Sequence, residues 1–303
     1  TLPEAAALPG GLRLELVDPG GDPPAAPDGT RAAGRAGGAP SGLRAEGVHA
    51  KAGQAKGVHA KGVQASLPDA GGAKATVIPA LSRAETLRTY FPDGTSQRRA
   101  TPYIGPRPSI VTRHGWGANE NLRERGFLYT KTVKAAFVHH TASGNKYSCS
   151  QVPSIIRSIY RYHVVSSGWR DIGYNFLVDK CGTIYEGRAG GVAKAVMGAH
   201  TRGFNTNSMG IAVIGSFGAT KPTDAALKAI SRLTAWKLGL YGADPRGKTY
   251  LKSAGGNLYR KGKNVRLNVI SGHRDGFATE CPGRLLYGKL GTARTTAAKY
   301  QGR

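Results

Sequence analysis

The chain has few cysteines, few acidic residues and no long apolar run. With only three cysteines in 303 residues, one disulfide plus one functional cysteine is the simplest arrangement if the protein is exported, whereas three reduced thiols would be ordinary in a cytosolic protein. No stretch approaches the roughly 18 consecutive apolar residues that a transmembrane helix needs. We therefore expect a soluble protein. Its start at Thr1, without a methionine, fits either a fragment or a processed chain, such as an exported protein whose signal peptide has been removed.

The shortage of acidic residues makes the chain strongly basic. Its 43 Lys and Arg exceed its 18 Asp and Glu, which gives a formal net charge of +25. Residues 1–108 contain 13 basic and 9 acidic residues, whereas the remainder contains 30 and 9. Such a charge indicates polyanionic surroundings, either nucleic acid, anionic wall polymers or membrane surfaces, without choosing among them. The alternative is a solvated cationic surface with no particular partner.

The first third of the chain differs in composition from the rest. Residues 1–75 are rich in Ala, Gly and Pro, and such sequence buries too little apolar surface to offset the entropy of ordering it. Residues 76–103 are more mixed and are compatible with a short strand or helix. Prolines at 102, 106 and 108 indicate a stiff linker. We predict a largely disordered region over residues 1–108, acting as a spacer or wall-associating segment, and a folded domain over 109–303.

Apolar periodicity within 109–303 predicts alternating strands and helices. Strands are expected at 133–138, 174–178, 183–185, 209–217 and 265–270. Helices are expected at 152–165, from an N-cap at Thr223 to residue 240, and from residue 285. This order predicts an α/β domain with a single mixed β-sheet flanked by helices. Strand ends in such a domain share one rim, so His139 and His273 are expected to lie near each other.

A histidine and a cysteine near the chain's end form a candidate metal site. His273 and Cys281 are eight residues apart, and imidazole and thiolate are preferred zinc ligands. A catalytic zinc site takes three protein ligands, and the best source of the third is His139 or His140. These two are adjacent on a predicted strand and face opposite sides, so only one can easily join the site. Periodicity does not say which.

Several motifs identify a family resemblance. Residues 109 to about 290 resemble the peptidoglycan recognition proteins and type 2 amidases, the zinc N-acetylmuramoyl-L-alanine amidases. The matching stretches are Arg-His-Gly-Trp-Gly at 113–117, Val-His-His-Thr at 138–141, Gly-Trp-Arg-Asp-Ile-Gly-Tyr-Asn-Phe at 168–176, Gly-Thr-Ile-Tyr-Glu-Gly-Arg at 182–188, Gly-Ala-His at 198–200, Asn-Ser-Met-Gly-Ile-Ala-Val-Ile-Gly at 207–215, Gly-His-Arg at 272–274 and Thr-Glu-Cys-Pro-Gly at 279–283. Residues 1–108 have no counterpart in this resemblance.

The resemblance implies a role for each site residue. It makes His139, His273 and Cys281 the ligands of a Zn²⁺ cofactor. Tyr174 matches the catalytic tyrosine, which would donate a hydrogen bond to the oxyanion. Thr279 matches a position, two before the cysteine, that helps orient water or substrate. Two carboxylates, Glu280 and Asp275, remain alternative proton shuttles, with Asp275 otherwise a partner that orients a ligand histidine.

Further residues bear on the substrate. Gly168, Trp169 and Arg188 resemble the pattern associated with diaminopimelate-type stem peptides, since an arginine fork suits the extra carboxylate. Ordinary packing is the alternative role for Trp169. Two more residues, His200 and Asn205, are expected to line the groove.

Two cysteines have no role in the proposed zinc site. Once Cys281 is assigned to zinc, Cys149 and Cys181 are expected to form a disulfide, the alternative being two thiols. We thus expect a secreted or wall-associated, monomeric zinc amidase that acts on peptidoglycan, with anionic wall polymers as a further partner and no specific nucleic acid. A binding module of the same fold is the main alternative, and a nucleic-acid-binding protein is the other.

Overall fold

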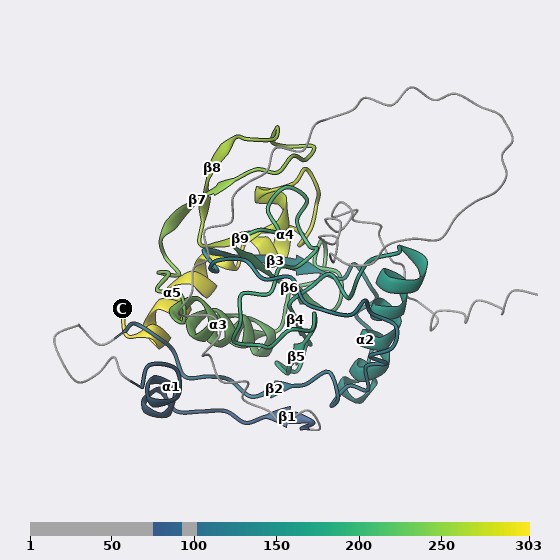
Figure 1. Ribbon diagram of the computed structural model, residues 1–303, viewed down its shortest axis with the longest axis horizontal. Helices are drawn as coiled ribbons and strands as arrows, with labels where there is room; N and C mark the ends of the chain where they lie inside the picture. Colours follow the sequence, from purple (N-terminus) through teal and green to yellow (C-terminus); the bar gives the residue numbers. More distant parts are fainter. Residues whose placement is uncertain (1–74, 93–101) are drawn as a thin grey trace, which may run out of the picture.

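The computed structural model describes residues 75–92 and 102–303. The predicted disorder of residues 1–74 lies outside the described residues. A seven-stranded mixed sheet runs through the domain (Figure 1) and confirms the predicted fold class. Its strand order is β1 (Val77–Ile78), β2 (Ile110–Val111), β5 (Ile184–Glu186), β4 (Phe176–Val178), β6 (Ser208–Val213), β3 (Ala135–His140) and β9 (Ile270–Gly272).

The centre of the sheet is parallel and buried on both faces. Strand β3 pairs in parallel with β6 over six residue pairs and with β9 over three. Every residue of β3 and β6 is buried, which explains why both read as nearly continuous apolar runs. The β4–β5 hairpin is antiparallel, and its strands correspond to those predicted at 174–178 and 183–185.

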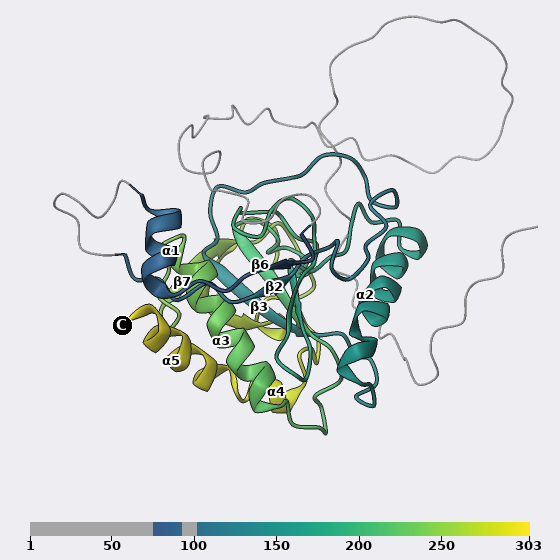
Figure 2. The ribbon, with the colours of Figure 1, turned by 90° about the horizontal axis from the view of Figure 1, so that it is seen from below.

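Helices cover the two faces of the sheet. Helices α3 (Asp224–Gly239) and α5 (Leu290–Gln301) pack on one face and α2 (Val152–Arg161) on the other (Figure 2). The Thr223 hydroxyl accepts a hydrogen bond from the Ala226 amide and caps α3, as predicted. The final predicted helix is divided by Gly288 into α4 (Arg284–Tyr287) and α5. No helix of the described residues is long and apolar enough to cross a bilayer.

The folded unit begins before the predicted boundary at residue 109. Strand β1 pairs with β2, and helix α1 (Arg83–Tyr90) packs against α3 through the rings of Tyr90 and Trp236, whose centroids are 6.0 Å apart. A capping box at Ser82 begins α1. Residues 75–92 and 102–108 therefore belong to the domain. The mixed stretch 76–103 does contain a strand and a helix.

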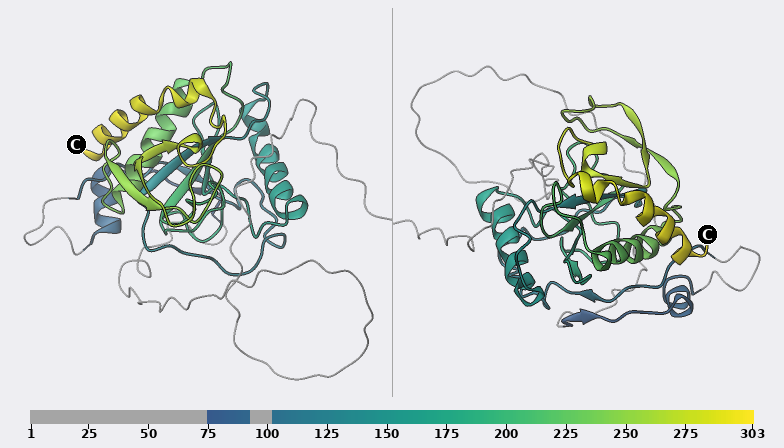
Figure 3. Two further views of the ribbon diagram at one scale, coloured as in Figure 1. Left: turned by 90° about the horizontal axis from the view of Figure 1, so that it is seen from above. Right: turned by 180° about the vertical axis from the view of Figure 1, so that it is seen from behind.

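The predicted strand at 265–270 is two strands in two sheets. Strand β8 (Asn264–Asn268) pairs antiparallel with β7 (Lys248–Lys252) in a separate two-stranded sheet, and β9 then joins the main sheet. Figure 3 shows this light-green hairpin beside the yellow C-terminal helices. Strand β7 escaped prediction because only Leu251 in its five residues is a buried apolar residue.

The predicted disulfide is confirmed. Cys149 and Cys181 are bonded, with their Cα atoms 6.4 Å apart. The bond joins the start of the α2 region to the β4–β5 turn. Closing a loop of this length is worth about 3 to 4 kcal/mol in the chain-entropy account.

Candidate metal centre and active site

Two parallel strands bring His139 and His273 together. Val138 pairs with Gly272 across β3 and β9, and each histidine is the next residue along its strand. Because the strands are parallel, both side chains emerge at the same rim of the sheet. Their ring centroids lie 4.4 Å apart, and both residues are buried. The strand ends thus place the two histidines side by side, as the sequence predicted.

A tight turn returns Cys281 to the same point. The Arg274 amide donates to the Cys281 carbonyl over 3.0 Å, which closes the loop between them. The Sγ of Cys281 lies 3.8 Å from Nδ1 of His139. One ligand atom from each of His139, His273 and Cys281 lies within 4.8 Å of the others. A tetrahedral zinc ion separates its sulfur and nitrogen ligands by roughly 3.5 Å, so the donor set fits zinc.

The electrostatics of the histidines also fit a metal site. Burial, followed by the charges of His273 and His200, holds the pKa of His139 well below its ordinary 6.5. Burial lowers the pKa of His273 to about 3. Both rings are therefore neutral near pH 7, the state that binds metal. Neither ring nitrogen of His273 has a hydrogen-bond partner in the described part of the chain, and a metal ion would satisfy one of them.

Strand alternation separates His139 from His140. The ring of His139 faces the other two donors, whereas His140 is absent from that group. Burial lowers the pKa of His140 to about 4. Its backbone N–H donates to Cys281 Sγ over 3.4 Å, a contact that favours the thiolate.

His200 is buried against the ring of His139. It is 2% exposed, and its Nδ1 is 3.3 Å from Nε2 of His139. Its backbone and that of Thr201 donate to Oδ1 of Asn205. The His200 ring packs against Gly210, where a Cβ would come within 2.4 Å of His200 Cγ. His200 supports His139, and Asn205 holds the His200 turn.

Tyr174 lies beside the three donors. Its ring centroid is 5.4 Å from that of His139 and 5.6 Å from that of His163. Burial and the nearby Cys281 raise the pKa of the phenol, so it stays protonated at neutral pH. Its hydroxyl makes no hydrogen bond to any described residue. Tyr174 therefore offers an uncommitted donor next to the metal centre.

The loop before Cys281 contains Thr279 and Glu280. The Thr279 hydroxyl accepts a hydrogen bond from the Cys281 amide over 3.2 Å, which fixes the cysteine's backbone. Glu280 is 85% exposed and lies 4.0 Å from Arg274. The geometry makes Glu280 a solvated carboxylate with a weak ion pair.

Asp275 stabilises the turn that follows β9. It accepts from the Gly272 amide over 2.9 Å and from the Tyr287 hydroxyl over 2.6 Å. It thereby orients His273 through the backbone and makes no contact with the imidazole nitrogens.

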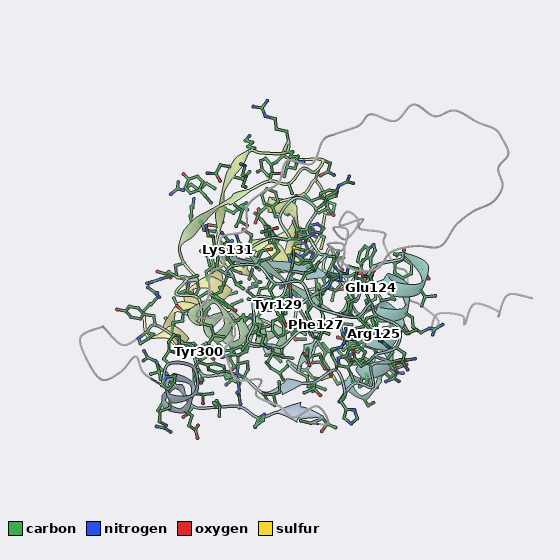
Figure 4. The ribbon with its side chains drawn as sticks, in the orientation of Figure 1. Glu124, Arg125, Phe127, Tyr129, Lys131 and Tyr300 are labelled. Atoms are coloured by element: carbon green, nitrogen blue, oxygen red, sulfur yellow. A yellow bond between two sulfur atoms is a disulfide. The ribbon has the colours of Figure 1, made fainter. Side chains whose placement is uncertain are left out.

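Three of the expected substrate residues are Gly168, Trp169 and Arg188. Trp169 stacks on His163 with centroids 4.4 Å apart, and Gly168 adopts a φ of +69° at an exposed turn. Arg188 is buried, and its guanidinium donates to the carbonyls of Ile172, Asp171 and Met197. It also lines a small cavity together with the exposed Phe127, which Figure 4 labels.

Two contacts at the site could not be predicted from the sequence. Phe277 stacks on His273 with ring centroids 5.6 Å apart and an interplanar angle of 20°. Asn257 exchanges two hydrogen bonds with the backbone of Ala278, at 2.8 and 3.2 Å. Nothing in the residue pattern around Asn257 distinguishes it from an ordinary polar loop residue.

Comparison with known proteins finds relatives of one family. The sequence model of the N-acetylmuramoyl-L-alanine amidase family matches residues 129–284. Peptidoglycan-recognition protein SC1a of Drosophila melanogaster is 31% identical over 192 residues, which is 62% of this chain and 87% of that protein. The N-acetylmuramoyl-L-alanine amidase of Homo sapiens is 32% identical over 190 residues, 61% of this chain and 28% of that protein.

A solved structure, wild-type Drosophila PGRP-LB, is 26% identical to this chain. It aligns with a TM-score of 0.48 over 60% of this chain and 92% of its own. The family match covers just over half of the sequence, and its residues include His139, Tyr174, His273 and Cys281. The chain therefore belongs to the family of type 2 N-acetylmuramoyl-L-alanine amidases and peptidoglycan recognition proteins.

Proposed function

We propose that the protein is a zinc-dependent amidase that cleaves the bond between the lactyl group of N-acetylmuramic acid and the L-alanine of the stem peptide. The observation that carries this proposal is the convergence of His139, His273 and Cys281 beside the uncommitted hydroxyl of Tyr174. Bound zinc would lower the pKa of a water molecule to near 7 and polarise the scissile carbonyl. Family membership supports peptidoglycan as the substrate class.

The chain's own residues have separate tasks in this reaction. His139, His273 and Cys281 would hold the ion, and His200 keeps the ring of His139 in place. Tyr174 donates a hydrogen bond to the oxygen on which negative charge develops, which is the stage where a fixed donor lowers the barrier most. Thr279 holds the backbone of Cys281 and can orient the substrate.

We infer that the preferred stem peptide contains diaminopimelate. The basis is the combination of Gly168 and Trp169 with Arg188, which lines the same small cavity as Phe127. Comparing hydrolysis of diaminopimelate-type and lysine-type muropeptides tests this inference. Equal rates on the two would contradict it. The disulfide supports an oxidising location, so we propose that the protein is secreted or wall-associated.

The second candidate is a module that binds peptidoglycan without cutting it. Relatives named recognition proteins favour it, whereas the complete donor set with Tyr174 favours hydrolysis. Digestion of purified peptidoglycan separates the two. We expect intact stem peptides with a free L-alanine amine, lost on chelation and in Cys281→Ala. Binding without any release would establish the recognition module.

A further inference from the structure

The β7–β8 hairpin gathers positive charge on one surface. Between Asp244 and Asp275 the sequence has no acidic residue and eight Lys and Arg. Six of these eight are exposed on the hairpin or on the loop that joins its strands, and none of the six forms an ion pair with any described residue: Lys248, Lys252, Arg260, Lys261, Lys263 and Arg266. Unpaired cations this close together create an attractive potential for a polyanion.

The strand register arranges part of this charge in a row. Lys248, Tyr250 and Lys252 lie on the exposed side of β7, and Arg266 of β8 is directly opposite Tyr250. Alternate residues of a strand are about 6.8 Å apart, so Lys248, Arg266 and Lys252 follow one another at intervals of about 7 Å along the hairpin. Tyr250, which is 55% exposed, lies among them. We call these four residues the basic hairpin face.

The opposite side of the hairpin is anchored beside the metal centre. Leu251, Val265 and Leu267 pack with Phe204 and Phe137, and Phe137 lies two residues before His139 on the same side of β3. Figure 1 shows the hairpin and α2 on either side of β3. The hairpin therefore occupies a fixed position next to the site.

The loop of the hairpin is tied directly to the loop that holds Cys281. The two hydrogen bonds between Asn257 and Ala278 join them, and Ala278 immediately precedes Thr279. A polymer lying on the hairpin would thus pass close to the proposed reaction site.

We propose that the basic hairpin face binds a linear phosphodiester polymer attached to the glycan strands of the wall. The placement beside the reaction site rests on the proposed function, but the binding itself does not. A chain with one negative charge per repeat can place successive phosphates against the three cations of the row. A polymer joined to the substrate glycan would contact the basic hairpin face while the glycan lies at the proposed reaction site.

Two other polyanions fit this face less well. Single-stranded nucleic acid is usually bound by several aromatic rings that stack on successive bases, and Tyr250 is the single aromatic residue of the basic hairpin face. A membrane-binding surface needs a large apolar side next to its cations. Leu251, Val265 and Leu267 of the two strands face inward, and Leu258 is the one exposed large aliphatic side chain of the loop between them.

The test is binding of purified poly(glycerol phosphate) to the full chain in the presence of chelator, so that no hydrolysis occurs. The variant is Lys248→Gln/Lys252→Gln/Arg266→Gln, which changes only exposed residues. The matched control, Arg161→Gln/Lys221→Gln/Lys228→Gln, removes three exposed cations elsewhere. We expect the hairpin variant to bind at least tenfold more weakly and to lose about two units of the log–log salt slope. The control should stay within threefold of the unchanged protein.

Each other outcome has a defined meaning. Equal weakening in both triple variants would overturn the proposal, because binding would then follow net charge. Equally tight binding of an oligonucleotide with the same number of phosphates, or of anionic vesicles, would overturn the assignment to a wall polymer. Release of stem peptides from polymer-free peptidoglycan, measured in parallel, should be the same in all three proteins. Its absence from the unchanged protein would contradict the amidase proposal and leave the binding result intact.

Discussion

The Sγ of Cys281 lies 3.8 Å from Nδ1 of His139, although 142 positions separate the two residues in the sequence. The central strand β3 presents the histidine, and the turn after β9 returns the cysteine to it. Both residues are buried, so the contact is held by the core of the domain. A thiol and an imidazole at this distance can bind the same metal ion, and His273 is the third ligand of the group.

Removing the Tyr174 hydroxyl should slow hydrolysis without affecting the metal. In Tyr174→Phe the ring keeps its packing against His139 and His163, but the proposed oxyanion donor is lost. We expect kcat to fall by about 10² to 10³, measured on a soluble muropeptide. Zinc content, determined by elemental analysis, should be unchanged. A variant as fast as the unchanged protein would show that Tyr174 does not act in the reaction.

His200 should affect metal affinity, because it supports His139. In His200→Ala the contact with Nε2 of His139 is lost, and we expect zinc affinity to fall by about 10- to 100-fold. Competition with a chelator of known affinity gives the measurement. His114→Ala is the control, since that histidine is exposed on a distant turn. Unaltered zinc affinity in the His200 variant would mean that its ring only fills space.

His163 should make stability depend on acid pH. Burial, and then Arg188, lowers its pKa to about 3 from an ordinary 6.5, and its Nδ1 accepts the Gly173 N–H over 3.2 Å. The unfolded chain therefore binds a proton that the folded one does not between these values. Above pH 6.5 the His163 ring is neutral in both states and does not lower the unfolding free energy. As the pH falls from 6.5 toward 3, protonation of the unfolded chain lowers the unfolding free energy by up to about 1.4 kcal/mol per pH unit.

The His163→Asn variant isolates this effect. The amide oxygen can still accept from Gly173 but does not titrate, so the unfolding free energy should fall less steeply between pH 6 and 4. Urea denaturation with chelator present is the measurement, since the other buried histidines then contribute equally to both proteins. Identical slopes for the two would contradict the assignment to His163.

Breaking the disulfide should destabilise the domain. We expect Cys149→Ser/Cys181→Ser to lose about 3 to 4 kcal/mol of unfolding free energy, measured by urea denaturation. A reducing agent should lower the stability of the unchanged protein and leave that of the double variant as it was. Equal stability of the two oxidised proteins would show that the bond contributes nothing to the fold.

Sequence patterns predicted the parts of the protein that have strong periodicity or specific motifs. The buried runs of β3 and β6 and the cap at Thr223 stand where they were expected. Adjacent strand residues also explain why only one of His139 and His140 joins the donor group, although the pattern itself could not say which.

Other features depend on contacts that no local pattern encodes. Strand β7 has a lysine at each end and only one buried apolar residue, so its sequence does not predict a strand. Its position depends on the packing of the hairpin against Phe137 and Phe204. The contact of His200 with His139 depends on the absent side chain of Gly210, which lies in a different motif of the sequence from either histidine. The two-residue strand β1 is too short to show periodicity.

Hydrolysis in water enriched in oxygen-18 tests the central proposal most directly, because the label marks the carbonyl that was attacked. We predict one heavy oxygen atom in the lactyl carboxylate of N-acetylmuramic acid, together with an unlabelled stem peptide that begins at L-alanine. Label in a peptide carboxylate or at a sugar reducing end, with the muramyl amide bond intact, would contradict the account.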